Sequence, residues 1–191
     1  MLRKRFLFLI MIVSVGFGLL WIEEYTTQRT EEDNEGASLL PDYYGEGLKN
    51  RSFDSNGVLN SQFEAQRSVH FPGQRLAELT LPKFTTTAED GEEWVIKSLS
   101  GTHFEDDKKM ILKDDVVISP LGSTPSEIKD KKLTTIRTSE LTLFTQTKIA
   151  KTDQPVEVID VRSRINAVGM IINIDQKRVE FLSQVNSKYE P

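Results

Sequence analysis

The feature that most restricts the fold of this chain is a period of two in its apolar residues from residue 57 onward. The longest run places Leu59, Phe63, Ala65, Val69 and Phe71 at odd positions, with mostly polar side chains between them. Successive side chains of a β-strand point to opposite faces of its sheet, so this run predicts a strand with one buried face. Shorter alternating runs occur at 77–81, 94–97, 141–143 and 179–185.

Turn-forming residues separate these runs. They are Asn56-Gly57, Pro72-Gly73, Asp90-Gly91, Asp106-Asp107, Asp114-Asp115, the segment from Pro120 to Pro125, and Asp153-Gln154-Pro155. No stretch after residue 22 repeats apolar residues at spacings of three and four, which argues against crossover helices. We therefore predict an all-β fold of antiparallel hairpins in series, either a sandwich or a jelly roll.

The segment from Ile165 to Ile174 differs from the other runs because both of its faces are apolar. Such a strand is either covered by the protein on both sides or meets a lipid or a partner on one side. The sequence leaves both interpretations open. Gly169, in the middle of the segment, predicts a β-bulge or the close approach of another backbone.

An uncharged run of 17 residues, 6–22, follows three basic residues near the N-terminus. As a helix it would span about 26 Å, close to the thickness of the hydrocarbon core of a bilayer. The positive-inside rule places residues 1–5 in the cytoplasm and the rest of the chain on the other side. The competing interpretation is a signal peptide, but the run is long for one and has no small-residue cleavage site after it. We predict an uncleaved, single-pass transmembrane helix.

The anchor is followed by residues 23–46, which are polar and acidic and predict a linker. Residues 47–191 then form one predicted β domain. The chain has no cysteine, which excludes disulfides, thiolate sites and a lipidated cysteine. The net charge is −5, and the part beyond the basic N-terminus is more acidic still, so we do not expect nucleic acid as a partner.

We find no arrangement of residues typical of catalysis. The two histidines, His70 and His103, are isolated in the sequence and are interpreted as surface residues. The acidic pairs at 106–107 and 114–115 lie in predicted turns and lack the spacing of a calcium loop. The protein is therefore predicted not to be an enzyme, and no metal or cofactor is expected.

Several motifs along the chain resemble those of the LptC family. They are Pro41-Asp42-Tyr43-Tyr44 before the domain, Asn56-Gly57 with Ala65-Gln66 on the first long strand, the segment from Leu81 to Thr86 with Trp94 after it, and a C-terminal segment from Gly169 through Phe181 to Glu190. The order of parts is also similar, with a basic N-terminus, an anchor, a tether and one β domain. The resemblance implies an open, twisted antiparallel β-jelly roll in the periplasm, held at the inner membrane by the N-terminal helix.

The resemblance also implies a function in lipopolysaccharide transport. The lipid would come from an ATP-driven LptB–LptF–LptG transporter, and soluble periplasmic LptA would accept it. Apolar residues expected to face inward would form a lipid-binding trough: Leu59, Phe63, Ala65, Val69, Phe71, Leu79, Leu81, Ile171, Val179 and Phe181. Each of them can equally be an ordinary core residue.

The last predicted strand, 177–185, is expected to be a free edge that pairs with LptA through Leu182, Gln184 and Val185. Two other classes of function stay open from the residues alone. One is an anchored scaffold subunit that binds only protein. The other is an anchored hydrolase of the cell envelope, for which we find no clustered nucleophile or acid pair.

Overall fold

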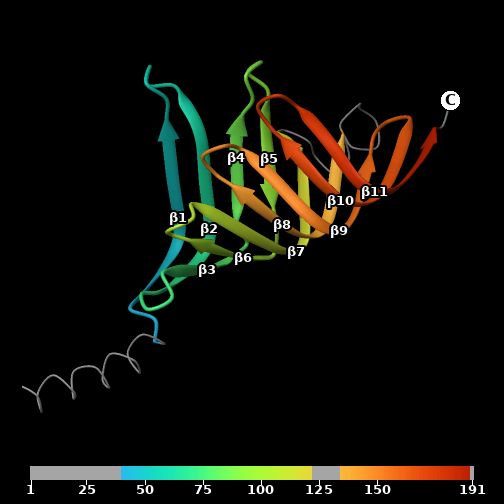
Figure 1. The fold of residues 1–191 in the computed structure, drawn as a ribbon. Coiled ribbons are helices and arrows are strands. Elements are labelled where there is room, and N and C mark those ends of the chain that lie inside the picture. Colours follow the sequence, from blue (N-terminus) through green and yellow to red (C-terminus); the bar gives the residue numbers. More distant parts are fainter. Residues whose placement is uncertain (1–39, 122–133, 190–191) are drawn as a thin grey trace, which may run out of the picture.

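The structure is a computed structural model that describes residues 40–121 and 134–189. Its regular structure in these ranges is β-strand throughout, and every strand pairing is antiparallel (Figure 1). The strands are β1 (Tyr43–Phe53), β2 (Leu59–Phe71), β3 (Leu76–Thr80), β4 (Lys83–Thr87), β5 (Glu93–Lys97), β6 (Ser100–Phe104), β7 (Lys109–Pro120), β8 (Thr135–Phe144), β9 (Ile149–Ile159), β10 (Ser163–Asn173) and β11 (Arg178–Tyr189).

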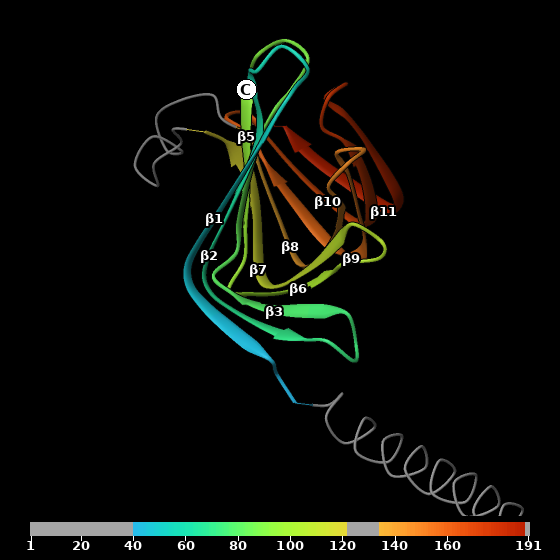
Figure 2. The same ribbon diagram turned by 90° about the vertical axis from the view of Figure 1, so that its left-hand side faces the viewer.

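These strands form one sheet that is folded into two walls. Its order is β11-β10-β9-β8-β7-β5-β4-β2-β3-β6; β1 pairs with β2, and β6 also pairs with β7. β2 pairs with β4 through residues 61–64 and with β3 through residues 67–71. In the same way, β7 pairs with β6 through residues 109–113 and with β5 through residues 117–120. We call the wall that contains β4 and β5 wall A and the wall that contains β3 and β6 wall B; the long strands run through both (Figure 2).

The line along which the sheet folds is made of bulges. Backbone φ is positive at Leu81, Asp114, Asp115, Gly169 and Gln184, which lie where β3 gives way to β4 and in the middle of β7, β10 and β11. The registers also shift there, between Lys113 and Val116 and between Val168 and Met170. A bulge adds a residue on one side of a pair and bends the strand, so each long strand turns the corner from one wall to the other.

The walls enclose an apolar core that lies between β4, β5 and β7 to β10. Its side chains are Phe84, Ile96, Met110, Leu112, Val116, Ile118, Ile136, Leu141, Leu143, Ala150, Val156, Val158, Met170, Ile172 and Ile174, and Phe63, Trp94, Ile165 and Phe181 pack against it. A second, smaller cluster of Ala65, Ala77 and Leu79 lies under β2 and β3. Phe63 contacts both clusters and so joins them.

The fold confirms the expected all-β class and corrects several predicted turns. Asp114-Asp115 and Asp153-Gln154-Pro155 do not reverse the chain, because they lie inside β7 and β9. The reversals are instead at residues 145–148, 160–162 and 174–177. Aspartate tolerates positive φ, so the same residues suit a bulge and a turn, and the sequence does not distinguish the two.

Two further predictions concern the N-terminal part. β1 begins at Tyr43, so the sheet includes residues 43–46, which were predicted to belong to the linker. The predicted transmembrane helix, 6–22, lies outside the described residues. Within the part of the chain that the structure describes, no helix is long and apolar enough to cross a membrane.

Candidate functional site

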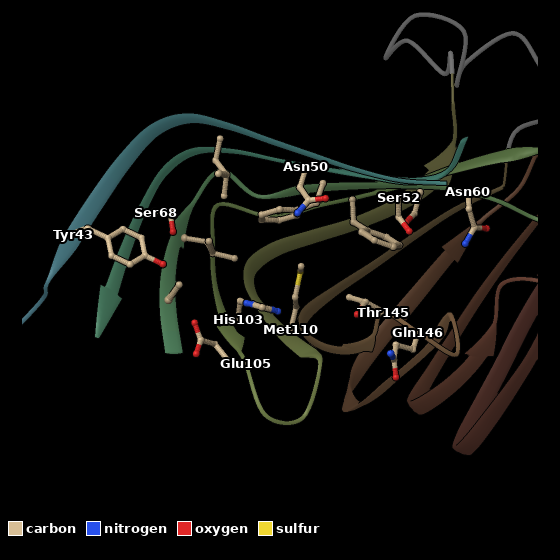
Figure 3. A pocket seen from close by; sticks show the side chains of 16 residues that line it. Tyr43, Asn50, Ser52, Asn60, Ser68, His103, Glu105, Met110, Thr145 and Gln146 are labelled. Atoms are coloured by element: carbon tan, nitrogen blue, oxygen red, sulfur yellow. The ribbon is translucent and has the colours of Figure 1, made fainter. Parts of the chain in front are cut away.

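A groove of about 640 Å³ opens between the two walls at the N-terminal end of the sheet (Figure 3). Its floor is apolar and is built by Leu48 of β1, Phe63 of β2, Leu79 of β3, Phe84 of β4 and Met110 of β7. Strand alternation sends these side chains to the inner face of the folded sheet. The groove is therefore a continuation of the core space that the protein leaves unfilled.

Polar side chains line the mouth of the groove on both sides. Asn50, Ser52 and Asn60 come from the β1–β2 hairpin, and His103, Thr145 and Gln146 come from wall B opposite them (Figure 3). Among the described residues that line the groove, Glu105 is the one carboxylate, and none is lysine or arginine. Burial lowers the pKa of His103 although the nearby Glu105 raises it, which favours a neutral imidazole. The groove thus combines an apolar floor with hydrogen-bonding groups at its rim that are uncharged apart from Glu105, which suits an amphiphile.

The structure brings three of the predicted trough residues together. Phe63 and Leu79 line the groove, and Ala65 packs beside Leu79 in the small cluster. Leu59 lies near the β1–β2 turn, beyond a register shift in the pairing of β1 with β2, and is exposed.

Val69 and Phe71 were predicted to face inward, and this is wrong. Between Ala65 and Ser68 the buried face of β2 changes from odd to even positions, because Gln66 and Arg67 are both exposed at the fold line. Ser68 and His70 therefore face the interior, opposite Leu79 and Ala77. Val69 instead lines a shallow hollow on the outer face together with Arg67 and Glu78.

Leu81 and Ile171 were also predicted inward and are not. Leu81 lies on the fold line with φ of 49° and is exposed. The bulge at Gly169, whose φ is 77°, resets the alternation of β10, so Met170 and Ile172 are buried and Ile171 points outward. The predicted bulge at Gly169 is confirmed, and a side chain also approaches it: a Cβ on Gly169 would lie 2.9 Å from Leu182 Cδ1.

The C-terminal candidates lie far along the sheet from the groove. Val179 and Phe181 pair with Ile172 and Met170, so they face inward on β11, and Phe181 packs against the main core. Among the described residues, the packed core lies between them and the groove, so within residues 40–121 and 134–189 the predicted trough residues do not line one common groove. Leu182, Gln184 and Val185 are exposed on β11, which is the outermost strand beyond β10 in the described sheet.

His70 is not the surface residue that the sequence suggested. It is buried, its ring stacks on Tyr43 with centroids 4.6 Å apart, and its Nδ1 lies 2.7 Å from Asp42 Oδ1. Its Nε2 is 3.0 Å from Glu105 Oε1, close enough for an ion pair but without hydrogen-bond geometry. The hydrogen bond to Asp42 raises the pKa of His70 and outweighs burial. The contact fixes the start of β1 against the body of the sheet.

Sequence reasoning missed most of the groove lining. Leu48, Phe84 and Met110 lie on three different strands, and the polar rim residues have no apolar periodicity that could reveal them. Ser68 was not among the predicted site residues. The parity change at the fold line was the missing information, and in β2 neither a glycine nor a proline marks it.

A family model described as "Lipopolysaccharide-assembly, LptC-related" matches residues 6–190. Among solved structures, the chain is similar to LptH of Pseudomonas aeruginosa, described as the LptA homologous periplasmic component of the conserved lipopolysaccharide transport device. The two share 10% sequence identity with a TM-score of 0.50, over 69% of this chain and 95% of that one, which shows a common fold. No match was found among curated proteins.

Proposed function

The chain belongs to the LptC family of lipopolysaccharide-assembly proteins, and from this we propose that it carries lipopolysaccharide from an inner-membrane LptB–LptF–LptG transporter to periplasmic LptA. Residues 6–22 would anchor it in the inner membrane, with the β domain in the periplasm. The protein would act as a non-enzymatic conduit, and the transporter would supply the energy of ATP hydrolysis.

The observation that carries the proposal is the groove with its apolar floor and a polar rim in which Glu105 is the one charged side chain among the described lining residues. Acyl chains gain free energy when they leave water for the surface formed by Phe63, Leu79 and Phe84. Sugar hydroxyls and amides can hydrogen-bond to rim residues such as Asn50 and Gln146. Phosphates would remain in water, since the described lining of the groove contains no lysine or arginine to pair with them.

Both ends of the sheet also suit a bridge. β1 and β11 each pair with one neighbour only in the described sheet, so their outer edges present unpaired backbone groups. A related β domain could continue the sheet at either edge by strand addition. We propose that β1 meets the transporter and β11 meets LptA.

A photo-crosslinking amino acid tests the lipid path in cells that contain the transporter. We expect lipopolysaccharide to be captured, in an ATP-dependent way, from Phe63, Ser68 and Leu79, which face the groove. The adjacent positions Gln62, Val69 and Glu78 are matched controls on the outer face and should capture little. Equal capture on both faces would contradict the groove as the site. Transporter binding without any lipid capture would instead support an anchored scaffold that binds only protein.

A further inference from the structure

Residues of three turns connect the two walls along the side of the folded sheet where the walls are not joined by strands. We call this group the clasp. It consists of Thr87, Asp90 and Glu92 at the β4–β5 turn of wall A, Lys148 at the β8–β9 turn of wall B, and Asp175 and Lys177 at the β10–β11 turn of wall B. These contacts join residues as distant in the sequence as Asp90 and Lys177, so they hold the two walls together and do not merely stabilise a hairpin.

Lys148 is the buried half of the clasp. Its Nζ donates to the carbonyl oxygen of Thr87 and to Asp175 Oδ1, both at 2.9 Å, and the residue is only 8% exposed. The backbone N–H of Ile174 also donates to the carbonyl oxygen of Lys148, at 3.1 Å. A buried ammonium needs all of its partners, so these bonds hold while the walls stay together.

Lys177 is the exposed half. Its ammonium pairs with the carboxylates of Asp90 and Glu92 across the gap between the walls. These two pairs are solvent-accessible, and exposed ion pairs contribute little individually. This half of the clasp can therefore open at small cost in free energy.

The clasp lies over the packed part of the interior. Ala88 and Ile174, which flank it, are buried, and beneath them the space between the walls is filled by Phe84, Ile96 and Met170 of the main core. The groove is on the β1–β3 side of this block, and the inward face of β11 is on the other side. An acyl chain that moves inside the sheet from the groove to β11 must separate the walls here.

We propose that the clasp is a gate for lipid passage, closed in this structure, which opens when acyl chains move from the groove toward β11. This inference rests on the proposed function. The entering chains would replace the side-chain contacts of the core, which keeps the interior apolar while the walls separate. The gate gives the domain two compartments, a receiving groove and a delivering edge, with a barrier between them.

A reversible bridge across the clasp tests the gate, because the chain has no cysteine of its own. In the full-length protein, Asp90→Cys is combined with Lys177→Cys and joined by a reducible bis-methanethiosulfonate reagent. A spacer is needed because a lysine side chain fills the gap, whereas a direct disulfide requires Cβ atoms about 3.8 Å apart. A photo-crosslinker at Phe63 reports lipopolysaccharide in the groove, and one at Phe181 reports its arrival at β11.

With the bridge in place, we expect capture at Phe63 to persist and capture at Phe181 to be lost, and reduction should restore it. The matched control carries Asp90→Cys with Glu92→Cys, bridged within one turn, and should capture at both positions. Undiminished capture at Phe181 under the cross-wall bridge, or equal loss with the control bridge, overturns the gate and leaves the proposed function standing. Absence of capture at Phe63 in the unbridged protein contradicts the proposed function itself.

Discussion

At the scale of single residues, Glu64 joins three strands on the outer face of the sheet. Its carboxylate accepts from Lys49 of β1 at 2.8 Å and from Lys83 of β4 at 3.0 Å, and these bonds lower the pKa of Glu64 from 4.5 to about 2. The folded state thus binds this proton less readily than the unfolded state, so the stabilisation is complete above pH 4.5 and is lost as the pH falls toward 2. We expect Glu64→Gln to lower the urea midpoint at pH 7.

Urea titrations across that pH range provide the check. The difference between wild type and Glu64→Gln should shrink steadily between pH 4.5 and about 2. The exposed pair of Arg75 and Asp106 supplies a control, since Asp106→Asn removes a carboxylate from a surface pair and should change stability much less. A difference independent of pH would mean that Glu64 acts through packing.

Gly169 meets two separate requirements. Its φ of 77° is unfavourable for other residues, and an added Cβ would come within 2.9 Å of Leu182 Cδ1. We expect Gly169→Ala to cost about 1–3 kcal/mol of unfolding free energy. The double variant with Leu182→Ala should recover only the part of this unfolding free energy that comes from the clash with Leu182. Gly91 has φ of 86° with open space around its Cα, so Gly91→Ala measures the cost of the backbone conformation alone. Equal losses of unfolding free energy at the two glycines would show that the Leu182 side chain moves away without cost.

At the scale of elements, the second half of β11 contributes an edge and almost no core. Residues 182–189 are all exposed, whereas Phe181 packs on the core. A chain that ends at Ser183 keeps Leu182 over Gly169 and should retain its fold. Because the outer edge of β11 would be shortened, we expect this variant to lose LptA and to keep the transporter in co-purification, compared with a control that ends at Tyr189. Loss of the transporter with LptA retained would reverse the two assignments.

At the scale of the whole molecule, the bulges decide the shape. Each long strand is bent near its middle, so one sheet supplies both walls and the space between them (Figure 2). Side chains fill this space under β4, β5 and β7 to β10 but leave it open near β1 to β3. The domain is therefore asymmetric along its length, with an open groove at one end and a packed block tied by ion pairs next to it.

Much of the architecture was readable from the sequence, because strand alternation and turn chemistry are local. The period of two predicted an antiparallel all-β domain, and the turns at 56–57, 72–73, 90–91 and 106–107 are where the chain reverses. The position of Gly169 inside an apolar strand predicted a bulge or a close approach, because glycine within a strand commonly marks one of the two. The parity of Phe63 and Leu79 was correct because no bulge separates Phe63 from Ala65 or Leu79 from Ala77, the apolar neighbours two residues away.

The tertiary structure alone decided which faces look inward beyond the fold line, and where the interior is empty. Alternation holds only up to the next bulge or fold line, so Val69, Phe71 and Ile171 were assigned to the wrong face. Asp114-Asp115 has the same chemistry whether it bends a strand or ends one, so it was assigned to a turn although it lies inside β7. The burial of His70 and Lys148 depends on partners 28 and 61 residues away. Packing of walls made from distant segments is a non-local property, and no periodicity within one strand contains it.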